Sequence, residues 1–124
     1  MKKQRPVNLD LTTIEMPMTA WASILHRATG VAFFFALVFV LVVWAISLQS
    51  PDGFACAKSL MQGVIGKVIT IGSLAALSYH IIGGIRHLVM DMGHWEELES
   101  ANLSAKLAML IWLVTVVLAG VWIW

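Results

Sequence analysis

Charged residues are scarce in this chain. Asp, Glu, Lys and Arg make up 12% of its 124 residues, whereas an average soluble domain carries about a quarter. Hydrophobic residues make up 60%, and the mean hydropathy is +0.86. This composition excludes an ordinary soluble domain of this length. We predict an integral membrane protein of the all-α class.

Cysteine is nearly absent, because Cys56 stands alone. An internal disulfide and a cysteine metal cluster are therefore excluded. No basic run accompanies the net charge of +1, so we expect no nucleic-acid partner. No secretory signal is recognisable either, since Asp10 and Glu15 interrupt the N-terminal region and the apolar run that follows is too long. An Arg/Ser-rich transit peptide is also missing, which favours a bacterial chain or a processed one.

Three apolar runs are long enough to cross a bilayer. Ala28 to Ser50 carries no charge over 23 residues, which as a helix extends about 34 Å. Ser50-Pro51-Asp52-Gly53 has the composition of a turn, and the acidic stretch over 91–100 that of a loop. We expect one membrane-anchor domain over 1–124, with a polar arm at 1–20 and three spans at roughly 21–48, 60–88 and 104–124.

The distribution of basic residues predicts the orientation. With the N-terminus inside, two basic residues lie outside, Lys58 and Lys67. The six inner ones are Lys2, Lys3, Arg5, Arg27, Arg86 and Lys106. This excess favours an N-terminus on the inner side of the membrane and a C-terminus on the outer side.

His80 lies deep within the second apolar run, where an ionisable side chain is costly and marks a candidate functional site. His80, Gly84 and His87 share one helical face at offsets of four and three. A haem held by His80 fits this pattern, with its acidic groups turned toward Arg86 and His87. A helix–helix packing seam with a hydrogen-bonded histidine fits it too.

A second cluster opens the first span, where Ser23, Arg27 and Gly30 share a face. A hydroxyl beside a guanidinium suits a carbonyl-bearing head group that gains negative charge on reduction. An arginine reaching toward lipid phosphates is the alternative interpretation. Because the two helices run in opposite directions, we expect His26, Arg27, Arg86 and His87 to gather at one interface.

A low-spin b-type haem takes two axial ligands, and only His80 lies deep enough to be one. His26, His87 and His94 lie at the interface or in the loop, and Met109 lies near the inner end of the third run. We therefore expect the second ligand to come from another chain, which makes the partner obligate.

Two stretches carry a family resemblance. They are Arg5-Pro6 followed by Ser23-x-x-His26-Arg27-x-Thr29-Gly30, and His80-x-x-x-Gly84-Ile85-Arg86-His87-x-x-Met90-Asp91-x-Gly93. At these positions, and in its three-span layout, the chain resembles the cytochrome b556 membrane-anchor subunits of succinate dehydrogenase, respiratory complex II.

The resemblance implies half of a heterodimeric haem-binding helical bundle in the bacterial inner membrane. His80 would be the haem b axial ligand from this chain, and Ser23 and Arg27 would line a ubiquinone site. His26, Arg27 and His87 would be candidates for the haem propionates. The implied partners are a second small anchor subunit, an iron–sulfur subunit, a flavoprotein subunit and membrane lipid. Electrons from succinate would pass through them to quinone in the respiratory chain and citric acid cycle.

Two other functions compete with this one. A fumarate reductase anchor would use the same scaffold in the reverse direction, although a haem-free anchor would not need His80. A small transporter or a purely structural anchor is the other alternative. A transporter typically carries a charged residue at the midplane, and here Asp and Glu are confined to the arm and the loops.

Overall fold

The computed structural model describes residues 10 and 12–124. Within them the chain forms four α-helices and no strand: α1 (Met18–Ser47), α2 (Pro51–Gln62), α3 (Val64–Asp91) and α4 (Leu98–Ile123). α1, α3 and α4 are long and apolar enough to cross a membrane. The predicted all-α, multi-pass membrane class is confirmed. Lys2, Lys3 and Arg5, with the Arg5-Pro6 motif, lie outside the described residues.

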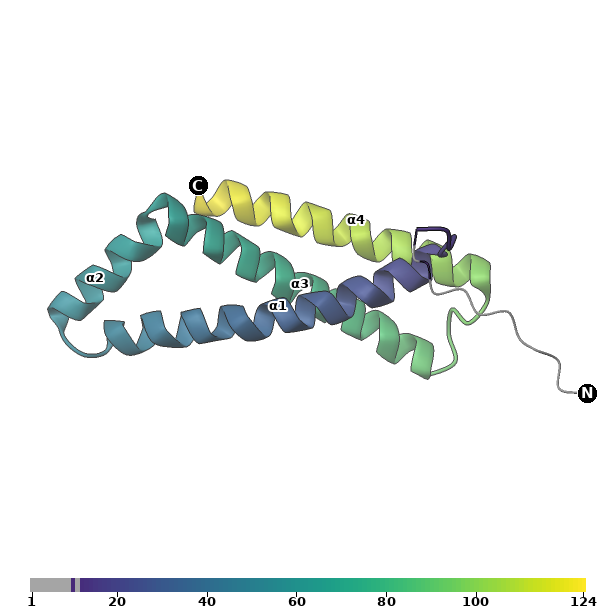
Figure 1. The fold of residues 1–124 in the computed structure, drawn as a ribbon, viewed down its shortest axis with the longest axis horizontal. Helices are drawn as coiled ribbons and strands as arrows, with labels where there is room; N and C mark the ends of the chain where they lie inside the picture. Colours follow the sequence, from purple (N-terminus) through teal and green to yellow (C-terminus); the bar gives the residue numbers. More distant parts are fainter. Residues whose placement is uncertain (1–9, 11) are drawn as a thin grey trace, which may run out of the picture.

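α3 is the central helix of the bundle. α1 crosses it, α4 returns alongside it, and α2 joins the far ends of α1 and α3 (Figure 1). The start of α1 and the α3–α4 connection lie at one end of the bundle. The C-terminus lies at the other end, beside the corner between α2 and α3 (Figure 1). Residues near the start of α1 therefore lie close to the C-terminal half of α3.

Small residues form the buried contacts between the helices. Among the described residues, Tyr79, at 2% exposure, is the one large side chain in the hydrophobic core, which otherwise consists of Ala22, Ala57, Ala76, Ala101, Ala105 and Ala108. Small side chains let helix backbones approach closely, which is how helices associate where lipid removes the hydrophobic driving force. The large apolar residues face outward instead, as Phe34, Phe35, Val121 and Trp122 do. The packed interior is a set of narrow seams.

α2 corrects the expectation of a turn after the first span. Ser50 caps this helix, because its hydroxyl accepts a hydrogen bond from the Gly53 N–H at 2.9 Å. Pro51 occupies the first helical position, and Asp52 lies in the first turn. A serine cap, a proline at the first position and an early acid together start a helix. The same residue types also favour turns, which is why the sequence alone predicts a turn at these positions.

α3 and α4 also begin at other residues than the expected spans, which start at about 60 and 104. α2 ends at Gln62 and α3 begins at Val64, because Gly63 between them is extended, with a φ of −67° and a ψ of 158°. α3 continues to Asp91, and Gly93 follows with a φ of 84° that favours glycine. α4 already begins at Leu98, so Glu99 stabilises its first turn instead of lying in a loop.

The corner between α2 and α3 requires a glycine at position 66. A Cβ on Gly66 would overlap the carbonyl oxygen of Leu60 and approach the Met61 Cα to 2.8 Å. Both neighbours are backbone, which cannot move aside without opening the corner. Gly72, two turns further along α3, has open space where its Cβ would be.

We expect Gly66→Ala to lower the stability of the protein by about 1–3 kcal/mol through overpacking. Gly72→Ala should be neutral or stabilising by up to about 1 kcal/mol, because alanine is the better helix former. Thermal unfolding of the two detergent-purified variants would measure the difference. Equal midpoints would show that the corner does not depend on this close approach.

Candidate functional site

Three imidazole rings stack where α1 crosses α3. The His26 ring, from α1, lies between two rings from α3. Its centroid is 4.2 Å from that of His80, with the planes at 7°, and 4.9 Å from that of His87, with the planes at 23°. His80 and His87 are about two helical turns apart, and the His26 ring lies in the space between their side chains. The crossing therefore brings together three of the histidines that the sequence suggested.

Hydrogen bonds to carbonyl groups fix the tautomers of the two outer histidines. His80 Nδ1 lies 3.1 Å from the carbonyl oxygen of His26, and His87 Nδ1 lies 2.8 Å from that of Gly83. A carbonyl oxygen only accepts, so Nδ1 carries the proton in both rings. In the neutral imidazole the lone pair is then on Nε2. Both rings present this lone pair as a potential ligand or acceptor.

His26 contributes an unsatisfied polar atom at the centre of the stack. Its Nε2 is buried and has no hydrogen-bond partner among residues 10 and 12–124. A buried polar atom without a partner costs roughly 1–3 kcal/mol. A Cβ on Gly84 would lie 3.5 Å from this nitrogen, so the backbone comes close to it without covering it with a side chain. It is the one buried side-chain polar atom without a partner in the described part of the chain.

Two other glycines make the stack possible. A Cβ on Gly83 would lie 2.9 Å from His26 Cδ2, and one on Gly30 would lie 2.8 Å from His80 Cε1. Each glycine thus faces a histidine of the opposite helix. Helical periodicity groups Gly30 with Ser23 and Arg27, and it does not reveal this contact. The signal was present in the sequence as a glycine one turn after His26, in a helix that crosses near His80.

Ser23 and Arg27 lie one turn apart on α1. Arg27 Nη2 donates a hydrogen bond to Ser23 Oγ at 3.4 Å, and the Arg27 side chain is exposed. His26, the residue before Arg27, carries the central ring of the stack. The serine hydroxyl and the guanidinium therefore form a polar pair at the same end of α1 as the histidines. Ser23 Oγ is the one side-chain partner of Arg27 among the described residues, and the other donors of the guanidinium could bind an oxygen-bearing group.

Arg86 does not join this group, although the sequence analysis expected it there. Its guanidinium faces α4, where Nε donates to Ser104 Oγ at 3.0 Å and Nη2 donates to the Ala101 carbonyl oxygen at 3.0 Å. The side chain is only 5% exposed. Arg86 follows His80 by six residues, which turns it about 120° away around the helix. His87, at seven residues, returns to the face of His80.

A buried aromatic pair, which the sequence analysis did not single out, braces α3 against both neighbouring helices. The Tyr79 hydroxyl donates to the Ala22 carbonyl oxygen of α1 at 3.2 Å. The Trp112 Nε1 of α4 donates to the Ala75 carbonyl oxygen of α3 at 2.9 Å. The two rings meet edge to face, with centroids 5.3 Å apart. A lone tyrosine inside an apolar run was the available signal, because a buried hydroxyl needs an acceptor.

Known proteins are similar to this chain over most or all of its length. A family model described as succinate dehydrogenase/fumarate reductase transmembrane subunit matches residues 1–119. A succinate dehydrogenase cytochrome b556 subunit of Coxiella burnetii is 36% identical over the whole of both chains. The subunit of that name from Paracoccus denitrificans is 35% identical, over 82% of this chain and 78% of its own. A cytochrome b560 subunit of Reclinomonas americana is 31% identical, over 84% and 76%.

Gly30→Ala tests the packing of the histidine stack. The added Cβ would displace the His80 ring and weaken its bond to the His26 carbonyl oxygen, so we expect a destabilisation of about 1–3 kcal/mol. Gly120→Ala is the matched control, because a Cβ there meets nothing within 4 Å. Thermal unfolding would compare them, and an unchanged midpoint for Gly30→Ala would contradict the close contact.

Proposed function

We propose, since the chain belongs to the succinate dehydrogenase/fumarate reductase transmembrane-subunit family, that it binds haem b through His80 and ubiquinone through Ser23 and Arg27. In this role it anchors the iron–sulfur and flavoprotein subunits to the membrane and forms part of the electron path from succinate to quinone. The observation that carries the proposal is the geometry of His80. Its Nδ1 is held by a backbone carbonyl oxygen of the opposite helix.

The histidine site suits a haem group in two respects. Metal-binding histidines characteristically donate their other ring N–H to a carbonyl or carboxylate group, which fixes the ring and raises its basicity. His80 has that arrangement, and its Nε2 lone pair remains available to iron. Gly30, facing the ring, leaves no side chain against its edge. When bound, a b-type haem supplies reversible one-electron transfer.

The propionate groups of the haem would meet the polar rim of the same crossing. His26 offers a buried Nε2 without a partner, and His87 offers an Nε2 whose tautomer is fixed by Gly83. Arg27 adds an exposed positive charge next to His26. These three residues form the proposed propionate rim. Arg86 is left out of it, because its guanidinium is bound to α4 on another face of α3.

The second axial ligand would come from a partner subunit. His80 is the histidine furthest along the span from the rim end, whereas His94 is exposed beyond the end of α3. The outward-facing apolar residues provide surface for the second small anchor subunit. Half of a heterodimeric bundle is therefore the proposed assembly. The N-terminus would be cytoplasmic and the C-terminus periplasmic in a bacterial inner membrane.

Ser23 and Arg27 are suited to a quinone head group. The hydroxyl and the guanidinium are both hydrogen-bond donors, and the guanidinium adds a fixed positive charge. Negative charge that develops on a quinone oxygen during reduction would be stabilised there more strongly than the neutral carbonyl. The 3.4 Å contact between the two side chains keeps both donors on one side of α1.

The reverse direction, fumarate reduction, uses the same type of anchor, and the family description names both enzymes. His80 and its fixed tautomer favour a haem-containing anchor of the succinate dehydrogenase kind. A haem-free anchor would have no use for an imidazole at this depth.

His80→Ala tests the haem ligand. We expect the purified complex to lose its low-spin b-type absorption bands or to show them shifted, because one axial nitrogen is removed. His94→Ala, in the exposed α3–α4 connection, is the matched control and should retain the spectrum. An unchanged spectrum in His80→Ala would refute the assignment of this ligand.

Arg27→Leu tests the quinone site. We expect the kcat/KM for quinone reduction to fall about 10–100-fold, the effect of losing a charged hydrogen bond of about 1.5–3 kcal/mol. Reduction of an artificial dye by the soluble subunits should be unaffected. Lys106→Leu, which removes an exposed charge at the start of α4, serves as control. If quinone and dye activities fell equally, the quinone site would have to lie elsewhere.

A further inference from the structure

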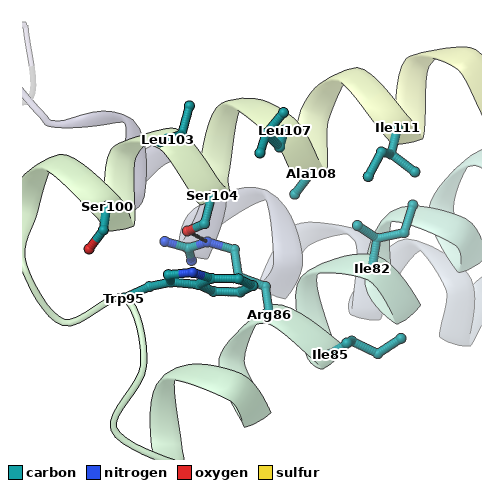
Figure 2. Close-up of a pocket in the computed structure, with 10 residues that line it drawn as sticks. All are labelled: Ile82, Ile85, Arg86, Trp95, Ser100, Leu103, Ser104, Leu107, Ala108 and Ile111. Atoms are coloured by element: carbon teal, nitrogen blue, oxygen red, sulfur yellow. Dashed lines mark hydrogen bonds between the residues drawn. The ribbon is translucent and has the colours of Figure 1, made fainter.

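A cavity of about 310 Å³ opens between α3 and α4, on the face of α3 turned away from the histidine stack. Its walls are mainly the apolar side chains Ile82, Ile85, Leu103, Leu107 and Ile111. At one end lie Arg86, Ser100 and Ser104, with the indole of Trp95 beside the guanidinium (Figure 2). The cavity thus has an apolar length and a single polar, positively charged end.

The charge of Arg86 has no counter-charge in the described part of the chain. The guanidinium carries five N–H donors. One is bound by Ser104 Oγ and one by the Ala101 carbonyl oxygen. Both acceptors are neutral, and the Arg86 side chain is 95% buried, its exposure being 5%. A buried charge is costly unless it is paired, so this site favours an anion that approaches through the cavity.

The start of α4 adds to this preference. Glu97, at the N-cap position, makes no side-chain capping bond, so the first N–H groups of the 26-residue helix lack a side-chain acceptor. The positive end of the helix dipole lies there too. Glu96, Glu97 and Glu99 are exposed and none of them lines the cavity.

The depth of the site matches that of a lipid headgroup. Arg86 precedes the last residue of α3 by five positions, which is about 7.5 Å along the helix. Trp95 follows in the α3–α4 connection, and tryptophan is enriched at the membrane–water boundary. The apolar walls at Ile82 and Ile111 extend from this level further into the span.

We propose that this cavity binds one anionic phospholipid, with its phosphate on Arg86 and part of an acyl chain along the apolar walls. Free phosphate would satisfy the guanidinium but would leave the apolar walls uncovered. A phosphodiester with an acyl chain satisfies both ends of the cavity.

The experiment uses the complex with its co-purifying subunits, extracted from the membrane in native lipid discs. Native mass spectrometry counts the anionic phospholipid that survives transfer into detergent. Arg86→Gln removes the charge, whereas Leu107→Trp fills the cavity and leaves Arg86 in place. Leu110→Trp, equally on α4 but outside the cavity, is the matched control. Leu107 and Leu110 are both exposed, so neither tryptophan should prevent folding.

We expect both cavity variants to lose one retained anionic lipid, and Leu110→Trp to keep it. In titrations of delipidated complex, phosphatidylglycerol should raise the thermal midpoint more than phosphatidylcholine does. Its apparent affinity should fall about tenfold in Arg86→Gln, the effect of losing one charged contact. Inorganic phosphate alone should have no effect.

Three results would overturn the proposal. The first is an unchanged lipid count in Leu107→Trp, which tests the cavity whether or not Arg86→Gln folds. The second is stabilisation by inorganic phosphate equal to that by phosphatidylglycerol, which would indicate an anion site only. The third is cross-linking of a photoreactive residue at Ser100 to a partner subunit instead of lipid, which would make the cavity part of a protein interface.

Discussion

The carbonyl oxygen of His26 is the point on which the structure of the site depends. It accepts the Nδ1–H of His80 at 3.1 Å from α3, and the Thr29 hydroxyl at 3.0 Å from its own helix. A backbone carbonyl group has no rotamers and does not titrate, so it is a rigid acceptor for the imidazole N–H. The bond forms only because Gly30 and Gly83 let α1 and α3 approach. Small residues at a crossing thus determine the tautomer of the histidine beside it.

The sequence predicted the membrane class for a clear physical reason, and it marked His80 as a candidate site. Long apolar runs have few alternatives to a spanning helix, and a deep histidine is rarely accidental. The contact of Gly30 with His80 could not be predicted, because periodicity identifies a helical face but not the residue opposite it. α2 was missed because Ser50, Pro51 and Asp52 are residue types that serve both turns and helix starts.

Arg86 shows a different kind of error. Its neighbour in sequence, His87, lies on the face of His80, and both residues were grouped by their distance along the membrane axis. Counting the rotation about α3 separates them, because six residues turn the helix by about 240° beyond one full turn and seven bring it back. The histidine face meets α1, and the arginine face meets α4. One helix can therefore serve two chemically independent surfaces at nearly the same depth.

The narrow seams of alanine between the helices have a consequence for the cell. Because Tyr79 is the one large hydrophobic side chain that is buried in the described part of the chain, the fold of a single copy buries little apolar area. Copies made in excess of the other subunits would keep their bulky faces uncovered.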